Sequence, residues 1–225
     1  AQTPQVVLGS EIQVQGTLDA NGTADQPITF TASNPAEPWG ELDVNGGTVR
    51  LSHAIVTLAG NSPRGGHTNT GPALRLRSDG QLNLESTSVT DVRGKIMQAT
   101  SGALAFQDTL FSRAVMGPEI EDTSLMMHDS WIVDMLGEFH HNGTVDDNDG
   151  IYLHRQRAGQ SIELEGGVVA GVEDDGIDTL GATAFIRDYI VRDVVDKGVS
   201  AFDGEVNLQR TLIVNAEIGI ETKGS

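Results

Sequence analysis

The residues best suited to chemistry gather in one stretch of the chain, HHNGTVDDNDGIYLHRQR, which begins at His140. Imidazole and ammonium groups can transfer protons in catalysis, and a guanidinium can neutralise the carboxylate of an acidic substrate. The candidate catalytic residues are His140, His154, Arg155 and Lys197. Alternatively, Lys197 only balances the negative charge around it, since it follows Asp196 directly.

Acidic residues crowd the same stretch and a corresponding turn further along the chain. The candidate metal ligands are Asp146, Asp147, Asp149, Asp174, Asp175 and Asp178. Calcium takes about 6 to 8 oxygen ligands, and neighbouring carboxylates repel one another unless a cation or a proton lies between them. The pattern therefore predicts a Ca²⁺ site. The alternative is a set of turn residues facing water, because Asp, Asn and Gly are frequent in turns.

Composition limits the possible partners. The chain of 225 residues carries 14 Lys and Arg against 32 Asp and Glu, a formal net charge of −18. Such an acidic surface cannot neutralise phosphates, which excludes nucleic acid and anionic membranes as partners. The absence of cysteine excludes disulfides, and the absence of an apolar run of about 18 residues predicts no membrane insertion. These properties suit a secreted or bacterial cell-surface protein.

An eleven-residue segment recurs along the chain and indicates a repeat. Its seven copies begin at Val49, Leu82, Leu104, Leu125, Ile162, Ala184 and Val206. Four of the six intervals are 21 or 22 residues long, and the intervals of 33 and 37 residues are that unit with an insertion. The sequence thus predicts one domain over residues 1–225, with loop insertions near residues 60–75 and 140–160.

The first, third, eighth and eleventh positions of every copy are apolar. The third positions are Leu51, Leu84, Phe106, Met127, Leu164, Ile186 and Leu208, and the eighth positions are Val56, Val89, Phe111, Ile132, Val169, Val191 and Ile213. A mostly polar residue separates the first position from the third, which is the period expected of a strand with one buried face. A single unit cannot bury that face, so the copies must stack and form continuous internal columns.

The predicted fold is therefore all-β, a right-handed, single-stranded parallel β-helix with coils of about 22 residues. A leucine-rich-repeat horseshoe is the main alternative, but the copies lack its fixed Leu-rich consensus. A β-sandwich would not require equal spacing.

A second, shorter strand introduced by glycine follows four of the copies. The glycines are Gly150, Gly176, Gly198 and Gly219, and each is expected to allow a backbone turn closed to residues with a Cβ. The next residue should point inward and the one after it outward. Tyr152, Asp178, Ser200 and Glu221 are thus expected to stack on one exposed face, and together with His141 they are the candidate substrate-binding residues.

Two parts of the chain resemble known proteins. GTLDANGTADQPITFTASNPAEPWGELDV, from Gly16 to Val44, is similar to the opening of many pectate-lyase-like right-handed β-helix proteins of bacterial surfaces. EDDGID from Glu173 and DKGVS from Asp196 are similar to β-helix regions found beside spore-coat-kinase-like and lamin-tail-like modules. The resemblance covers most of the chain and implies the fold, with further modules expected in the same polypeptide.

The resemblance also implies two kinds of chemistry. In the lyases of this family Ca²⁺ or Arg neutralises a uronate carboxylate, and a Lys, Arg or His removes the neighbouring proton. In the related hydrolases paired Asp residues act as acid and base. Because the fold also serves adhesins and plain stalks, it does not select one activity.

The function expected from the sequence is an extracellular β-helix domain that presents a carbohydrate-facing surface to a polysaccharide or a cell-surface glycan, with Ca²⁺ as a candidate stabilising ion. One alternative is a polysaccharide lyase or glycoside hydrolase that acts on an acidic polysaccharide. The other is a structural stalk or an adhesin segment.

Overall fold

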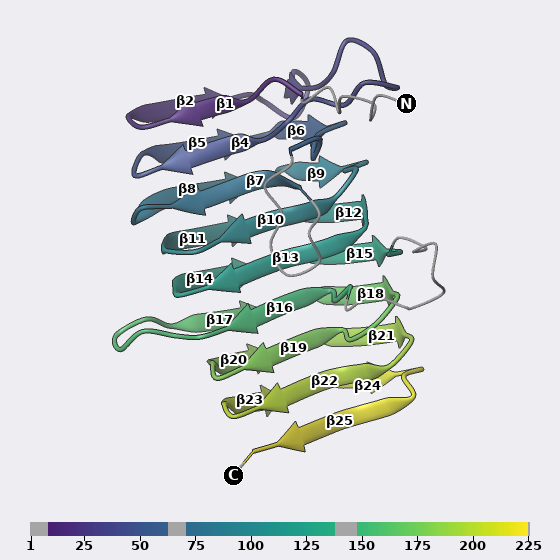
Figure 1. Cartoon of the computed structure of the whole chain (residues 1–225). Helices are drawn as coiled ribbons and strands as arrows, with labels where there is room; N and C mark the ends of the chain where they lie inside the picture. Colours follow the sequence, from purple (N-terminus) through teal and green to yellow (C-terminus); the bar gives the residue numbers. More distant parts are fainter. Residues whose placement is uncertain (1–8, 63–70, 138–147, 225) are drawn as a thin grey trace, which may run out of the picture.

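The protein is built from stacked strands in three parallel sheets (Figure 1). A computed structural model describes residues 9–62, 71–137 and 148–224. Within these residues the first sheet has nine strands, and the second and third sheets have eight each. The chain visits the three sheets in turn and then begins the next coil, so the predicted parallel β-helix is confirmed. No helix in this part of the chain is long and apolar enough to cross a membrane.

The strands of each sheet follow one another at every third position along the chain. The first sheet contains β1 (Ile12–Val14), β4 (Leu42–Asn45), β7 (Pro72–Arg77), β10 (Lys95–Ala99), β13 (Met116–Glu121), β16 (Ile151–His154), β19 (Ile177–Leu180), β22 (Lys197–Phe202) and β25 (Ile218–Lys223). The second sheet contains β2 (Thr17–Asn21), β5 (Thr48–Ser52), β8 (Gly80–Glu85), β11 (Gly102–Gln107), β14 (Thr123–His128), β17 (Ile162–Glu165), β20 (Thr183–Arg187) and β23 (Glu205–Gln209). The third sheet contains β3 (Ile28–Phe30), β6 (Ala54–Thr57), β9 (Ser88–Thr90), β12 (Leu110–Ala114), β15 (Trp131–Met135), β18 (Val168–Val172), β21 (Ile190–Val194) and β24 (Leu212–Val214).

The predicted apolar columns are present in the strand register. Phe106 pairs with Leu84 on one side and with Met127 on the other, and the pairing continues in both directions from Leu51 to Leu208. The eighth positions pair in the same way from Val56 to Ile213. The side chains of both columns lie in one core, which is what holds the coils together.

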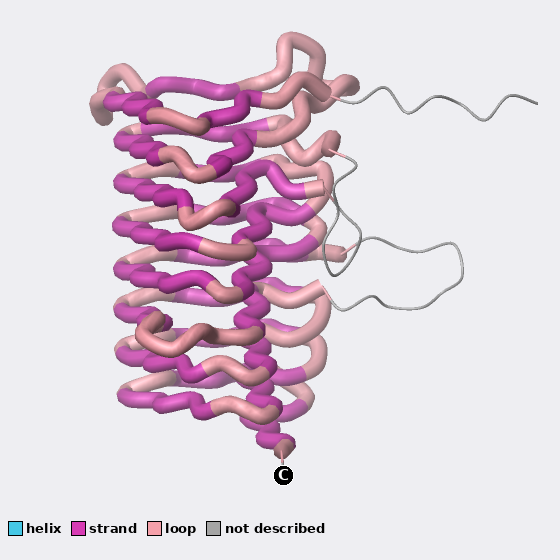
Figure 2. The backbone as a smooth tube through the Cα atoms, turned by 60° about the vertical axis from the view of Figure 1, so that its left-hand side comes forward, coloured by secondary structure: helices cyan, strands magenta, loops and turns pink. Residues whose placement is uncertain are grey.

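Each eleven-residue copy forms two strands separated by a corner. The fifth position of each copy has a positive φ and turns the chain from the second sheet into the third: His53, Ser86, Asp108, Asp129, Gly166, Asp188 and Arg210. The tenth position also has a positive φ, at the end of the third-sheet strand: Leu58, Asp91, Arg113, Asp134, Gly171, Asp193 and Asn215. Asp and Asn tolerate this left-handed conformation because their short side chains hydrogen-bond locally. The corners stack along the solenoid axis (Figure 2).

The glycines that introduce the first-sheet strands serve a different purpose from the one expected. Gly150, Gly176 and Gly198 are not among the residues with positive φ. A Cβ added to Gly150 would lie 2.4 Å from the carbonyl oxygen of Gly176, and a Cβ added to Gly176 would lie 2.7 Å from that of Gly198. These positions require glycine because successive coils approach closely there.

Candidate functional site

The outer face of the first sheet carries the predicted stack of polar residues. Tyr152 pairs with Asp178, Asp178 with Ser200, and Ser200 with Glu221, one on each successive strand. Asp178, Ser200 and Glu221 are half-buried. Tyr152 is only 7% exposed, so the stack passes from an accessible part into a buried part.

The stack continues through residues that sequence reasoning missed. Tyr152 pairs with Glu119, Glu119 with Gln98, Gln98 with Arg75, and Arg75 with Asp43. Asp43 pairs in turn with Gln13 of β1. We call the complete file the polar row: Gln13, Asp43, Arg75, Gln98, Glu119, Tyr152, Asp178, Ser200 and Glu221. The members from Asp43 to Glu119 could have been found in the sequence. The first-sheet strand of each coil lies shortly before the eleven-residue copy of that coil.

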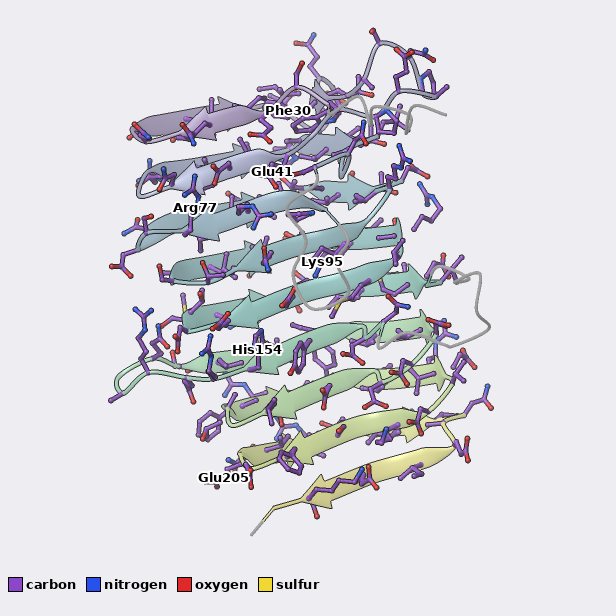
Figure 3. The ribbon with its side chains drawn as sticks, in the orientation of Figure 1. Phe30, Glu41, Arg77, Lys95, His154 and Glu205 are labelled. Carbon is purple, nitrogen blue, oxygen red and sulfur yellow. The ribbon has the colours of Figure 1, made fainter. Side chains whose placement is uncertain are left out.

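A cluster of ionisable side chains lies around Glu119 and Tyr152, in the buried part of the polar row. Lys95 Nζ lies 2.5 Å from Glu119 Oε2, and His154 Nε2 lies 3.5 Å from Glu119 Oε1. The His154 ring stacks on the Tyr152 ring, with centroids 4.5 Å apart and an interplanar angle of 5°. We call these four residues, Lys95, Glu119, Tyr152 and His154, the Glu119 cluster. Figure 3 shows Lys95 and His154 on the first sheet.

The buried carboxylates of Glu41 and Asp43, near this cluster, are each paired with an arginine. Arg75 Nε donates to Glu41 at 3.0 and 3.1 Å, and its guanidinium also donates to Gln98 Oε1. Arg77 donates to both carboxylate oxygens of Asp43, at 2.9 and 2.7 Å. Such pairing is required here, because an unpaired buried charge is strongly unfavourable.

The electrostatics of the Glu119 cluster follow from its burial. Burial lowers the pKa of the Lys95 amine, Glu119 opposes that shift, and Arg75 adds to it. A group whose pKa is perturbed by burial and by a specific charged partner is a candidate for acid–base chemistry. His154 Nε2 is buried and has no hydrogen-bond partner among the described residues, and Glu119 Oε1 lies 3.5 Å from it.

The structure separates the predicted catalytic residues. His154 is the outward residue at the end of β16, whereas Arg155 lies at the following corner, where it contacts the Glu121 carboxylate. Through Leu180, His154 aligns with Phe202 of β22, and Lys197 begins that strand five residues earlier, about 16 Å along it. His154 and Lys197 therefore cannot act on the same atom.

Some predicted residues fall outside the part of the chain that the structure describes. His140, the candidate substrate contact His141, and the candidate metal ligands Asp146 and Asp147 are among them.

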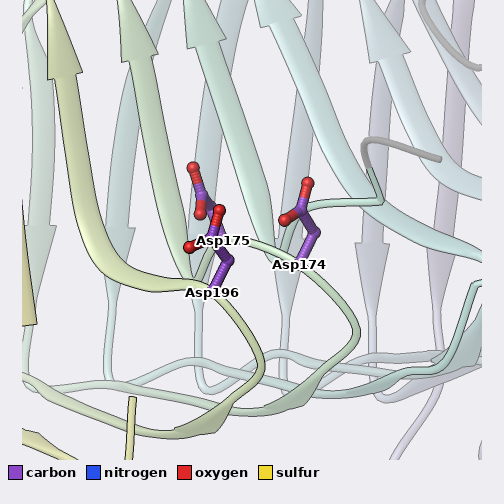
Figure 4. Close-up of side chains that lie close together, drawn as sticks. All are labelled: Asp174, Asp175 and Asp196. Carbon is purple, nitrogen blue, oxygen red and sulfur yellow. The ribbon is translucent and has the colours of Figure 1, made fainter. Parts of the chain in front are cut away.

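Three carboxylates meet at the corner that precedes β19 and β22. Oxygen atoms of Asp174, Asp175 and Asp196 all lie within 4.8 Å of one another (Figure 4). Two other predicted ligands are not in this group. Asp149 is buried one coil earlier, and Asp178 lies in the polar row.

The ammonium of Lys197 lies in the same corner. Its Nζ lies 3.1 Å from Asp175 Oδ1 and also contacts Asp196. Burial acts to lower the pKa of Lys197, but hydrogen bonds to Asp196 and Asp175 outweigh it and raise the pKa. Burial raises the pKa of Asp175, against the effect of the Lys197 hydrogen bonds. Lys197 thus supplies positive charge at the position where the sequence predicted a metal ion.

Comparisons with known proteins find likeness to solved structures. No family model matches the chain, and no curated protein matches it. Among solved structures, an alginate lyase from Paenibacillus sp. str. FPU-7 aligns with a TM-score of 0.38 and 9% sequence identity, over 94% of this chain and 90% of that one.

Proposed function

We propose that the protein binds a polysaccharide along the outer face of its first sheet. The observation that carries this proposal is the accessible half of the polar row, where Asp178, Ser200 and Glu221 follow one another on successive strands. Each coil thus offers one hydroxyl or carboxylate to hydrogen-bond with sugar hydroxyl groups. Secretion or display at a bacterial surface is part of the same proposal.

An apolar file beside the polar row supports this proposal. His154 pairs with Leu180, and Leu180 with Phe202. Leu180 is 38% exposed and Phe202 is 41% exposed. An exposed aromatic ring next to hydrogen-bonding groups suits a sugar, because the C–H face of a pyranose packs on aromatic rings while its hydroxyl groups bind polar side chains.

The test uses affinity electrophoresis in gels that contain polygalacturonate, alginate or xylan. We expect at least one polymer to retard the protein, and Phe202→Ala to reduce that retardation. Trp131→Ala is the control, since Trp131 is 54% exposed on the third sheet. Equal mobility in every gel would rule out polysaccharide binding at these concentrations.

Cleavage of an acidic polysaccharide is the second candidate function, and the geometry of the Glu119 cluster favours it. In such a reaction His154 would remove the proton next to a uronate carboxylate, and the electron pair would form a carbon–carbon double bond. The glycosidic carbon–oxygen bond would break, and the Tyr152 hydroxyl would protonate the leaving oxygen. Glu119 would remain paired with Lys95, and its other carboxylate oxygen lies 3.5 Å from His154 Nε2.

The test measures the ultraviolet absorbance of unsaturated uronate products. We expect His154→Gln to reduce the rate by about 100-fold or more, as for loss of a general base. Arg155→Ala is the matched control, because Arg155 is the next residue and its side chain is 68% exposed. Absence of product from every uronate polymer tested would leave the protein as a binding module.

Calcium binding remains a prediction, and we propose it at the corner where two predicted ligands, Asp174 and Asp175, lie beside Asp196, which was not among the predicted ligands. If Ca²⁺ binds there, its addition should raise the melting temperature and EDTA should lower it. Lys197→Met should strengthen this response, because it removes the competing ammonium. Identical melting curves with Ca²⁺ and with EDTA, in both proteins, would disprove the prediction.

A further inference from the structure

Two hollows lie over the outer face of the second sheet. The upper one, about 360 Å³ in volume, extends from β2 to β14 and is lined by Asn83, Gln107 and His128 among others. The lower one, about 240 Å³, extends over β17, β20 and β23 and is lined by Phe185 and Asn207 among others. Because these strands are consecutive neighbours in one sheet, the hollows follow each other along the solenoid axis.

One file of outward-facing side chains connects the two hollows. Asn83 pairs with Ala105, and Ala105 with Met126. The file then continues through Glu163 to Phe185. Met126 is 49% exposed and Phe185 is 50% exposed. We call the two hollows and the file between them the groove. Its floor is partly apolar, and the amide of Asn83 lies toward its upper end.

The repeat of this groove matches an extended sugar chain. Neighbouring strands lie about 4.8 Å apart, which is close to the length of one pyranose unit in an extended polysaccharide. From Asn83 in β8 to Phe185 in β20 there are four strand steps, or about 19 Å. A chain of about four sugar units would therefore reach from one to the other.

The rim of the groove offers further hydrogen-bonding groups. Gln107 and His128 pair on adjacent strands along one side of the upper hollow. Among the described residues His128 Nε2 has no hydrogen-bond partner, but neighbouring atoms cover it, and it lies 3.9 Å from Glu165 Oε2.

The charges in the groove favour a neutral ligand. Arg50 is paired with Asp19 at 3.1 Å, and Arg187 with Glu165 at 2.5 Å. The carboxylates of Glu85 and Glu163 also line the hollows. A uronate chain would meet these carboxylates with both guanidiniums already paired, whereas a neutral sugar chain would not be repelled.

We infer that the outer face of the second sheet binds an extended, neutral oligosaccharide that runs parallel to the solenoid axis. This surface is separate from the first-sheet face, and the inference does not depend on the proposed function. The exposed ring of Phe185 would pack on one sugar, and the amide of Asn83 would hydrogen-bond another.

The experiment is isothermal titration calorimetry of the whole chain with neutral β-1,4-linked hexasaccharides: cellohexaose, xylohexaose and mannohexaose. Binding of at least one hexasaccharide is expected, with weaker binding of the corresponding disaccharide, which is too short to reach from Asn83 to Phe185. Phe185→Ala and Asn83→Ala should each weaken binding of the hexasaccharide about five- to tenfold. Thermal melting of both variants checks that they are folded.

Trp131→Ala is the control, because Trp131 is a comparably exposed aromatic residue on the third sheet, outside both proposed binding surfaces. It should leave binding of the hexasaccharide unchanged. The inference is overturned if none of the three hexasaccharides binds, or if binding survives both second-sheet substitutions. Loss of binding in Phe202→Ala alone would also overturn it, and would place the glycan on the first sheet instead.

Discussion

At the scale of single residues, glycine determines how closely the coils can stack. Gly176 and Gly219 occupy equivalent positions at the start of first-sheet strands. A Cβ added to Gly176 would lie 2.5 Å from Val191 Cγ1, whereas a Cβ added to Gly219 would meet no atom within 4 Å. Alanine substitutions at these two glycines therefore distinguish the effect of crowding on stability from the effect of reduced backbone flexibility.

Gly176→Ala should lower the free energy of unfolding by about 1 to 3 kcal/mol, because the new methyl group must displace the neighbouring coil. Gly219→Ala should change it by only about 0.5 kcal/mol, as for an uncrowded site. Urea denaturation followed by circular dichroism measures both values. Equal costs for the two substitutions would contradict the explanation by close approach.

The buried pair of Lys95 and Glu119 is a second test at this scale. The side chain of Lys95 is 0% exposed and that of Glu119 is 5% exposed. Removing one member of a buried pair leaves a charge without its partner, so Lys95→Met should cost about 3 to 5 kcal/mol. The double variant Lys95→Met with Glu119→Leu should recover a large part of that loss. A double variant no more stable than Lys95→Met would mean that the Glu119 charge is compensated by other groups.

At the scale of single elements, the corners are tied together from coil to coil. Arg113 donates to both carboxylate oxygens of Asp91 at 2.7 Å, and Arg210 donates to both carboxylate oxygens of Asp188 at 2.6 Å. Each of these pairs joins corner residues of adjacent coils. The hydrogen bonds from Arg113 and Arg210 hold the pKa values of Asp91 and Asp188 below the usual carboxyl range.

These depressed pKa values predict a loss of stability in acid. A carboxyl group with a lower pKa in the folded state stabilises the fold at pH values above its unfolded pKa of about 3.8, and that contribution disappears as the pH falls through the folded pKa. Asp188→Asn removes the charge at a left-handed corner that Asn tolerates. Its melting temperature should therefore fall less steeply than that of the unmodified protein below pH 4.

The control for this prediction is Asp203→Asn. Asp203 is also a left-handed corner residue, but among the described residues its carboxylate has no ion-pair partner. Its melting temperature should follow that of the unmodified protein across the same pH range. A similar flattening in both variants would show that the ion pair is not the cause.

The elements also show how far the sequence could predict the structure. The buried columns were predictable because every coil repeats the same apolar positions, and each strand pairs in that register. The corners were not recognised, because an Asp such as Asp108 or Asp188 has the same appearance in the sequence whether it faces a metal ion or bends the backbone. Many acidic residues of this chain are corner residues.

The candidate site was less predictable than the fold. In the lower half of the polar row each residue comes two positions after a glycine that recurs from coil to coil. This repeat made it possible to predict that Asp178 and Ser200 are neighbours. The Glu119 cluster has no such local pattern, since Lys95 and Glu119 meet only through side chains on different strands. Interactions of this kind depend on side-chain conformation across coils, which residue spacing does not specify.

At the scale of the whole molecule, the solenoid is a linear array in which each coil is supported by its neighbours. Ile132 and Ile213 belong to the same internal column, but Ile132 is 0% exposed in a central coil. Ile213 lies in β24, the terminal strand of the third sheet, and is only half-buried. The same residue type thus has two neighbouring coils in one case and one in the other.

This arrangement predicts unequal costs for the same substitution in the 225-residue chain. Ile132→Ala should lower the free energy of unfolding by about 2 to 5 kcal/mol, because it opens a cavity between two coils. Ile213→Ala should cost clearly less, since part of that side chain is already in water, and hydrogen exchange should be faster in β23, β24 and β25 than in β11 and β12. If the two costs were equal, Ile213 would have to be covered by a second molecule in solution, which a concentration dependence of the unfolding midpoint would reveal.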